Sequence, residues 1–299
     1  MAIELPINFE EAWPWMRGFR RIVRTVAEPR LTGCDLFSAS DFSGSHKGSK
    51  FNVYSFLLID PERSAAFFRR ISLVRATFLG GRRMSFKALN DKQRQAALVP
   101  FLEASERLHG VCCSIAVTKT YPYMATAPST ATSMTNTMNL EGRWNKDVFE
   151  TAMRAVMLWS VLVSEVGNGM QNITWVLDED EIAANDLRHT DLLQLSGRIG
   201  QHFIRRQMGG LCVCTTASEG TDIRFEDFSA VTDLAAGAFC EAVNRWARSP
   251  ENQTDAEGRY ELTDHSGKCD LINDWFFYPS TSLRRVAVLI LKQANPPTV

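Results

Sequence analysis

Apolar residues follow two patterns in this chain, and the two patterns alternate along it. Short apolar runs bounded by polar turns are typical of strands buried in a sheet, and they predict strands at 35–40, 51–59, 111–117, 172–177 and 211–215. Between these runs, apolar residues recur at the spacing of an amphipathic helix, which predicts helices at 9–27, 61–79, 91–108, 146–166, 191–206 and 228–246. The alternation predicts an α/β protein with one mixed β-sheet and helices on its faces.

Turn and cap residues place several of the helix ends. Asp60-Pro61-Glu62 is typical of a helix start, because Asp caps free N–H groups and Pro fits the first turn. Gly80-Gly81 is expected to end that helix. Asn90 or Asp91 is expected to cap the next helix, and Pro100 to kink it.

The segments between and beyond these elements carry weaker patterns. Residues 82–87 are basic and predicted to be extended, 120–142 are predicted to form a long loop, and 249–270 a polar surface connection. The tail at 271–292 is expected to pack back as a strand or helix. Its aromatic run 275–278 could stack on nucleic-acid bases, but we expect it in the core. We expect one domain over 1–299, with an N-terminal helical extension at 1–32, a core at 33–248 and a C-terminal extension at 249–299.

Charge and cysteine usage narrow the class of protein. The 33 Lys and Arg residues nearly balance the 34 Asp and Glu residues, so the molecule lacks the strong positive field of a non-specific nucleic-acid-binding protein. The seven cysteines form no Cys-x-x-Cys pair and are expected to be reduced and buried in a cytoplasmic protein. The most apolar helical run, 155–163, is shorter than the roughly 20 residues that cross a bilayer, so no membrane contact is expected.

Three aspartates occupy positions where α/β proteins bind ligands. Asp41 follows the first strand and precedes a small, polar turn, and Asp178 ends the strand at 172–177. Asp233 lies on a helix among small residues, which allow that helix to lie close to the sheet. Local roles are the alternatives for the first two: Asp41 can start an Asx turn, and Asp178 can begin a polar loop. Converging carboxylates favour Mg²⁺ or Mn²⁺, and a pair of such ions hydrolyses phosphodiesters.

Several motifs together resemble a ribonuclease-H-like family of unknown function whose members open with an Asp-Glu-Ser-Gly strand end. The matching segments, in chain order, are Ser40-Asp41-Phe42-Ser43-Gly44, the strand 51–59, Met84-Ser85-Phe86-Lys87, the strand 111–119 ending in Lys119, Trp175-Val176-Leu177-Asp178 and the helix 230–237 around Asp233. The resemblance covers about residues 33 to 245. It implies a ribonuclease-H-like mixed sheet and metal-dependent cleavage of nucleic acid, either DNA or RNA. It further implies that Asp41, Asp178 and Asp233 hold the metal, while Lys87 and Lys119 contact phosphate or neutralise transition-state charge.

The chain departs from the family pattern at two acids, because Phe42 and Ser85 stand where the family has glutamates. Asp180, Glu181 and Glu103 are candidates to fill the gap. Two hypotheses follow. The first is a metal-dependent nuclease, and the second is a degenerate ribonuclease-H-like protein that binds or scaffolds a protein partner.

Overall fold

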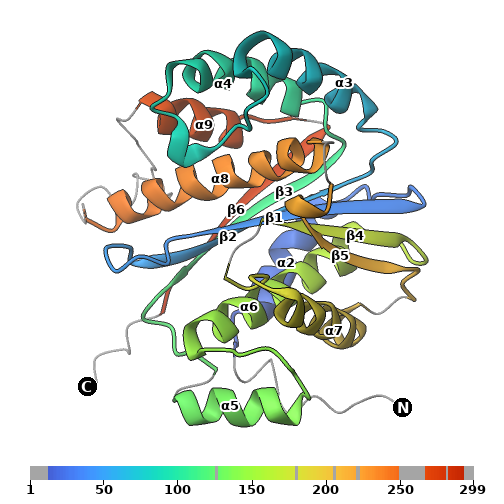
Figure 1. Cartoon of the computed structure of the whole chain (residues 1–299), viewed down its shortest axis with the longest axis vertical. Coiled ribbons are helices and arrows are strands. Elements are labelled where there is room, and N and C mark those ends of the chain that lie inside the picture. Colours follow the sequence, from blue (N-terminus) through green and yellow to red (C-terminus); the bar gives the residue numbers. More distant parts are fainter. Residues whose placement is uncertain are drawn as a thin grey trace.

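The computed structural model describes residues 13–124, 127–178, 181–204, 207–219, 223–248, 267–280 and 282–292. Within these ranges the chain forms an α/β structure around one six-stranded mixed sheet, as the alternating pattern predicts (Figure 1). The strands are β1 (Asp35–Ser43), β2 (Phe51–Ile59), β3 (Gly110–Thr118), β4 (Asn172–Leu177), β5 (Leu211–Thr215) and β6 (Leu283–Ile290). Their order is β5-β4-β1-β2-β3-β6. Only β2 runs antiparallel to its neighbours, and every other adjacent pair is parallel.

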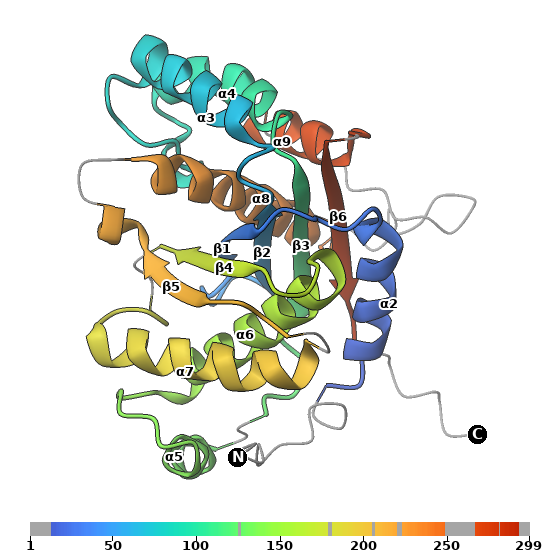
Figure 2. The ribbon, with the colours of Figure 1, turned by 90° about the vertical axis from the view of Figure 1, so that its right-hand side faces the viewer.

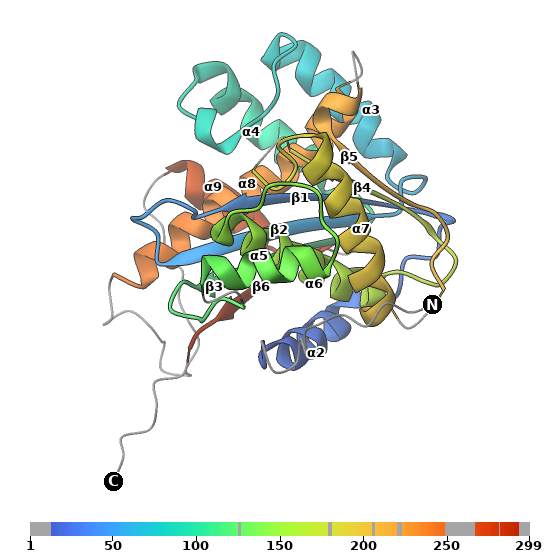
Figure 3. The same ribbon diagram turned by 60° about the horizontal axis from the view of Figure 1, so that its bottom comes forward.

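Helices cover both faces of the sheet (Figure 2). On one face, α8 (Arg224–Trp246) packs across β1, β2 and β3, and an outer layer of α3 (Ala65–Val74), α4 (Lys92–Ser105) and α9 (Gly267–Phe277) lies beyond it. On the other face lie α2 (Met16–Ala27), α6 (Lys146–Val166) and α7 (Asp186–Phe203), with α5 (Pro128–Thr137) outside them (Figure 3). Short helical turns occur at Arg75–Leu79, Phe86–Ala88 and Thr216–Glu219.

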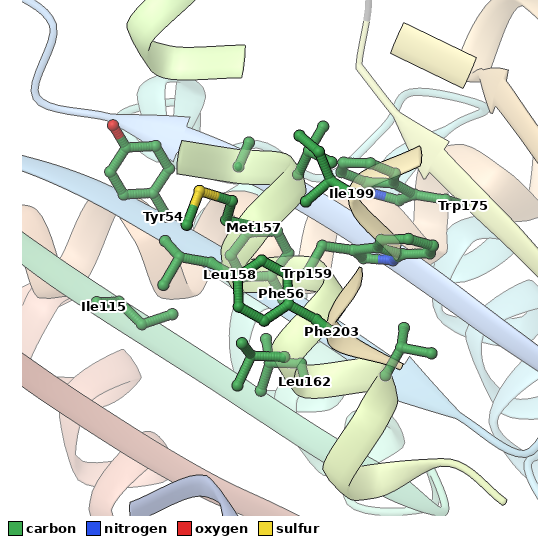
Figure 4. Packing of buried hydrophobic residues seen from close by; sticks show 14 of the residues in the cluster. Tyr54, Phe56, Ile115, Met157, Leu158, Trp159, Leu162, Trp175, Ile199 and Phe203 are labelled. Carbon is green, nitrogen blue, oxygen red and sulfur yellow. The ribbon is translucent and has the colours of Figure 1, made fainter. Parts of the chain in front are cut away.

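Two tryptophans on the α6 face of the sheet show which way the side chains of β1 point. The rings of Trp159 and Trp175 stack at 4.7 Å between centroids (Figure 4). Their indole nitrogens donate to the hydroxyls of Ser38 at 3.2 Å and Ser40 at 3.0 Å, respectively. Since alternate residues of a strand face opposite sides, Asp41 is directed toward the α8 side of the sheet.

Most of the predicted elements are confirmed, and several boundaries are wrong. Helix 146–166 and strands 172–177 and 211–215 match the predictions. The first strand extends to Ser43, so Asp41 lies within the strand instead of after it. The predicted helices at 191–206 and 228–246 begin earlier, at Asp186 and Arg224. These starts depend on polar N-terminal turns in which the apolar spacing is not yet visible.

Two segments predicted to be irregular are helical. The predicted loop at 120–142 contains α5, which has a proline in its first turn and buries Ala131 and Thr135 at helical spacing. Residues 82–87, predicted to be extended, enter the helical turn Phe86–Ala88. A short helix with few apolar residues lacks the periodicity that would predict it.

Helix starts and ends follow the predicted signals only in part. Asp91 caps α4 by accepting hydrogen bonds from two backbone N–H groups. Gly80 ends the helical turn 75–79 in the left-handed conformation, as predicted. The carboxylate of Asp60 instead accepts from the N–H of Arg63 in a turn, and α3 begins only at Ala65. The predicted helix at 9–27 begins at Met16, and its residues 9–12 lie outside the described ranges.

The C-terminal extension packs back on the core as both a helix and a strand, α9 and β6. Residues 249–266 of the predicted surface connection lie outside the described ranges. The prediction that the aromatic run 275–278 belongs to the core is wrong for its last two members. Phe276 is buried, but Phe277 and Tyr278, at the C-terminal end of α9, are exposed.

The state of the cysteines and the apolar character of the helices test two further predictions from the sequence. All seven cysteines are free, as expected, but Cys34 and Cys212 are exposed where burial was predicted. Cys212 lies on β5, an edge strand with a neighbour on one side only, and Cys34 lies just before the start of β1. Within the described residues, no helix has the length and apolar character needed to cross a bilayer.

Candidate functional site

The three predicted metal ligands line one pocket, at the edge of the sheet where β1 and β4 end. The pocket encloses about 290 Å³ of empty space, including solvent at its mouth. The strand register brings the first two acids together. Ser40 of β1 pairs with Leu177 of β4, so the next residue of each chain segment, Asp41 and Asp178, reaches the same level of the sheet. The pairing of β1 with β4 therefore brings together two acids that lie far apart in the sequence.

Helix α8 supplies the third aspartate and a fourth carboxylate. Glu226, Ser229, Ala230 and Asp233 all line the pocket, and their spacing of three, four and seven residues places them on one face of the helix. A Cβ atom on Gly237, one turn further, would lie 2.2 Å from the Phe86 ring. The small residues of α8 therefore do allow close approach, as predicted, and at Gly237 the neighbour is the turn Phe86–Ala88.

The connection between β2 and β3 closes the pocket with a positive charge. Arg83 lines the pocket, and its Nη1 lies 3.3 Å from Oδ2 and 3.4 Å from Oδ1 of Asp178. Arg94 holds the backbone of Arg83 by donating from Nε to its carbonyl oxygen at 2.9 Å. Thr216 donates from its hydroxyl to Oδ1 of Asp178 at 3.3 Å. Asp178 thus contacts both Arg83 and Thr216.

The carboxyl group of Asp233 is held by the Phe86 turn, and its pKa is raised. Its Oδ2 accepts a hydrogen bond from the N–H of Phe86 at 2.9 Å. Burial raises the pKa of Asp233, and this effect outweighs the hydrogen bonds from Phe86 and Ser85 and the charges of Arg83 and Lys87, which act to lower it. Ser85, which stands where the family pattern has a glutamate, therefore stabilises the ionised form of Asp233.

The two predicted phosphate-contacting lysines lie in different places. Lys87 is exposed on the turn Phe86–Ala88, close enough for its charge to lower the pKa of Asp233. Lys119 follows β3, and its Nζ donates to the carbonyl oxygen of His46 at 2.7 Å, in the turn between β1 and β2. Neither lysine is among the residues that line the acidic pocket, but the charge of Lys87 acts on one of the pocket acids, Asp233.

Of the residues considered as replacements for the missing acids, the described ones, Glu181 and Glu103, do not line the pocket, and Glu226 does. Glu181 lines a neighbouring pocket, Glu103 lies on α4 in the outer layer, and Asp180 lies outside the described residues. Phe42 packs its ring against Tyr54 at 5.6 Å between centroids. Since Phe42 follows Asp41 in the strand, its side chain faces the α6 side, away from Asp233.

Sequence reasoning missed Arg83, Thr216 and Glu226. Glu226 lies seven residues before Asp233 and so shares its helix face, but the helix was predicted to begin only at Phe228. Thr216 follows β5 as Asp178 follows β4, and the ends of consecutive parallel strands were a usable signal for it. No sequence pattern singles out Arg83, because its contact with Asp178 depends on the path of the β2–β3 connection.

The donor set of the pocket fits a hard divalent cation in its chemistry, since four carboxylates and several hydroxyls line it. Among the described residues, however, no group of three or more acidic, histidine or cysteine side chains is arranged to hold a metal ion. Arg83 contacts Asp178, and Phe86 contacts Asp233. The ligand types suit a metal, while their arrangement favours contacts within the protein.

The sequence matches no protein-family model and no curated protein.

Proposed function

We propose that this protein is a ribonuclease-H-like, metal-dependent nuclease that hydrolyses phosphodiester bonds. The observation that carries the proposal is the gathering of Asp41, Asp178 and Asp233 in one pocket. These acids come from β1, the end of β4 and α8, which are far apart in the chain. Three carboxylates brought from separate elements to one sheet edge are costly to hold together unless positive charge compensates them.

The sheet also supports a ribonuclease-H-like fold. The resemblance implies a mixed sheet whose first strand carries the leading aspartate, a later strand that ends in the second, and a closing helix that carries the third. Asp41 on β1, Asp178 after the adjacent parallel strand β4, and Asp233 on α8 agree with that arrangement.

Asp41, Asp178 and Asp233 would hold Mg²⁺ or Mn²⁺, with Glu226 as a further carboxylate. Such an ion activates water and stabilises the departing oxygen. Thr216 orients the carboxylate of Asp178 through its hydroxyl. Arg83 supplies a positive charge at the pocket that can pass from Asp178 to a substrate phosphate. The raised pKa of Asp233 means that its proton is lost at a higher pH than in an ordinary aspartate.

The substrate of the proposed enzyme is nucleic acid, either DNA or RNA. The net charge of −1 makes recognition local, and Arg83 and Lys87 supply positive charge that acts on Asp233. The free state of all seven cysteines supports a reducing, cytoplasmic compartment.

A second candidate function is a degenerate ribonuclease-H-like subunit that binds a partner without catalysis. The observation that favours it is the pairing of Arg83 with Asp178, together with the lack of a metal-competent group among the described side chains. In that case Arg83 neutralises an acid that no longer binds metal.

The deciding experiment compares Asp41→Asn with Asp35→Asn. Both aspartates lie on β1, but Asp35 is at the opposite end and accepts from Asn172 at 3.1 Å. Mn²⁺ binding is measured by calorimetry, and cleavage is measured on single-stranded DNA, single-stranded RNA and a DNA–RNA hybrid. The nuclease proposal expects wild type and Asp35→Asn to bind Mn²⁺ and to cleave. Asp41→Asn should lose about a hundredfold or more in cleavage rate.

The outcomes separate the two candidates. A wild-type protein that neither binds millimolar-range Mn²⁺ nor cleaves any of the three substrates refutes the nuclease and favours the degenerate subunit. Equal losses in Asp41→Asn and Asp35→Asn would show that damage to β1, and not loss of a ligand, is responsible.

A further inference from the structure

A second hollow is lined mainly by residues of α4, of α9 and of the segment after α9. Both helices belong to the outer layer, beyond α8 from the sheet (Figure 2). This groove encloses about 1240 Å³ of empty space, including open solvent. Its apolar lining comes from α4 and from α9 with the residues that follow it: Val99, Leu102, Leu271, Trp275 and Tyr278. We call it the α4–α9 groove.

Several large apolar side chains of the α4–α9 groove are exposed to solvent. Val99 and Leu271 are each 46% exposed, and Tyr278 is 73% exposed. Phe277, next to Tyr278, is 49% exposed. Isolated exposed apolar residues are common, but a contiguous set from two helices marks a surface that another molecule covers. Because Tyr278 is exposed, the prediction that this aromatic run lies in the core is wrong at Tyr278.

Carboxylates accompany the apolar lining. Glu103, Glu106 and Asp274 all line the groove. Glu106 is paired with Arg285. Glu103 and Asp274 have no ion-pair partner within the described part of the chain, and both are therefore available to a positively charged ligand. An apolar lining combined with unpaired acids is complementary to a surface that is both apolar and basic.

We propose that the α4–α9 groove binds a basic amphipathic helix of a partner protein. Such a helix would place aliphatic side chains at positions i, i+3, i+4 and i+7 against Val99, Leu271 and Trp275. Its Lys or Arg residues would reach Glu103 and Asp274. The proposal is independent of the nuclease proposal, because none of the groove residues lines the acidic pocket.

The longer segments of this chain that lie outside the described residues do not have the charge expected of the groove's occupant. Residues 249–266 carry five Asp and Glu residues against one Arg, and residues 1–12 carry three Glu and no Lys or Arg. Residues 293–299 carry no charged side chain. None of these segments complements Glu103 and Asp274, whereas a basic helix from another protein does.

The test uses model peptides and matched variants of the full chain. The probe is a fluorescein-labelled peptide of about 15 residues, or about four helical turns, built from Leu and Lys in an amphipathic pattern. Its controls are a scrambled peptide of the same composition and a Leu–Glu peptide with the original pattern. Binding is followed by fluorescence anisotropy.

We expect the amphipathic Leu–Lys peptide to bind at least about tenfold more tightly than either control peptide. Leu271→Ser should weaken this binding about tenfold, since a buried leucine contact is lost. Leu187→Ser should leave it unchanged, because Leu187 is similarly exposed, at 49%, but lies on α7. The double variant Glu103→Gln/Asp274→Asn should weaken binding and reduce its salt dependence, whereas Glu62→Gln, an exposed acid outside the groove, should not.

Three results would overturn the proposal. The scrambled peptide binds as tightly as the amphipathic one, or Leu187→Ser weakens binding as much as Leu271→Ser does. Alternatively, light scattering finds a wild-type dimer that Leu271→Ser converts to a monomer, without peptide binding to either, which would assign the groove to a second copy of this chain.

Discussion

Replacing Arg83 with alanine is expected to move metal affinity and catalysis in opposite directions. In the wild type, Arg83 contacts the Asp178 carboxylate at 3.3 Å, with side chains that are 45% and 39% exposed. An ion pair with this exposure contributes about 0.2–1 kcal/mol. Its removal releases Asp178 for a cation, and the corresponding gain in metal affinity is about 1.4- to 5-fold. The same change removes the guanidinium that we expect to reach the substrate phosphate, so cleavage should fall about tenfold or more.

The assay is a Mn²⁺ titration by calorimetry, followed by initial cleavage rates at saturating Mn²⁺. Arg82→Ala is the matched control, since Arg82 is the neighbouring residue, is 50% exposed, and pairs with Asp91 at 2.8 Å. Arg82 does not line the acidic pocket. If Arg83→Ala binds Mn²⁺ no more tightly than wild type, the argument that Arg83 competes for Asp178 is wrong. The same conclusion follows if Arg82→Ala shifts the affinity equally.

Three further predictions concern stability and the pocket. Gly237→Ala introduces a Cβ atom 2.2 Å from the Phe86 ring, so it should destabilise the protein by about 1–3 kcal/mol in urea and weaken Mn²⁺ binding; an unchanged unfolding midpoint would contradict the close packing. Because burial raises the folded-state pKa of Asp233, its contribution to stability is present at low pH and is lost as pH rises from the unfolded value of about 4 through the raised folded value. Asp233→Asn should remove that loss in unfolding free energies measured from about pH 4 to pH 7, and parallel pH profiles would count against the assignment. Asp191 is buried and accepts from the N–H groups of Glu141 and Gly142 and from the Trp144 indole at 2.7–2.9 Å; Asp191→Ala should cost about 3 kcal/mol or more, and a loss below about 1 kcal/mol would show that this segment is not held by the carboxylate.

Local patterns were sufficient for the elements with strong periodicity. Helix α6 and strand β4 follow the predicted boundaries, because each buries most of its apolar side chains. Strand β5 also matches its predicted bounds, although it buries only Val213 and Cys214. The same patterns marked Asp41 and Asp178 as acids that each end an apolar strand, although β1 continues past Asp41 to Ser43. The local patterns were insufficient for α5, whose buried positions are Ala131 and Thr135, since so weak an apolar face does not stand out from a loop.

The candidate site was predictable in its aspartates and not in their partners. Small residues around Asp233 indicated a helix close to the sheet, and α8 does pack on β1 and β2, while at Gly237 the close neighbour is Phe86. Arg83 was missed because it reaches Asp178 from a connection whose path is determined by the outer helical layer. Lys119 was expected at the site as the last residue of a strand end, but its ammonium group turns to the His46 carbonyl.

The sequence by itself determined the succession of strands and helices, because periodicity and caps act over a few residues. It also marked Asp41, Asp178 and Asp233 as candidate metal ligands. Only the tertiary structure decided which acids meet. The register of Ser40 with Leu177 brings Asp41 level with Asp178, and the passage of α8 across the sheet adds Asp233 and Glu226. The fold also decided that Tyr278 is exposed in the α4–α9 groove instead of buried. Strand register and helix docking depend on contacts between residues far apart in the chain, and no local pattern contains them.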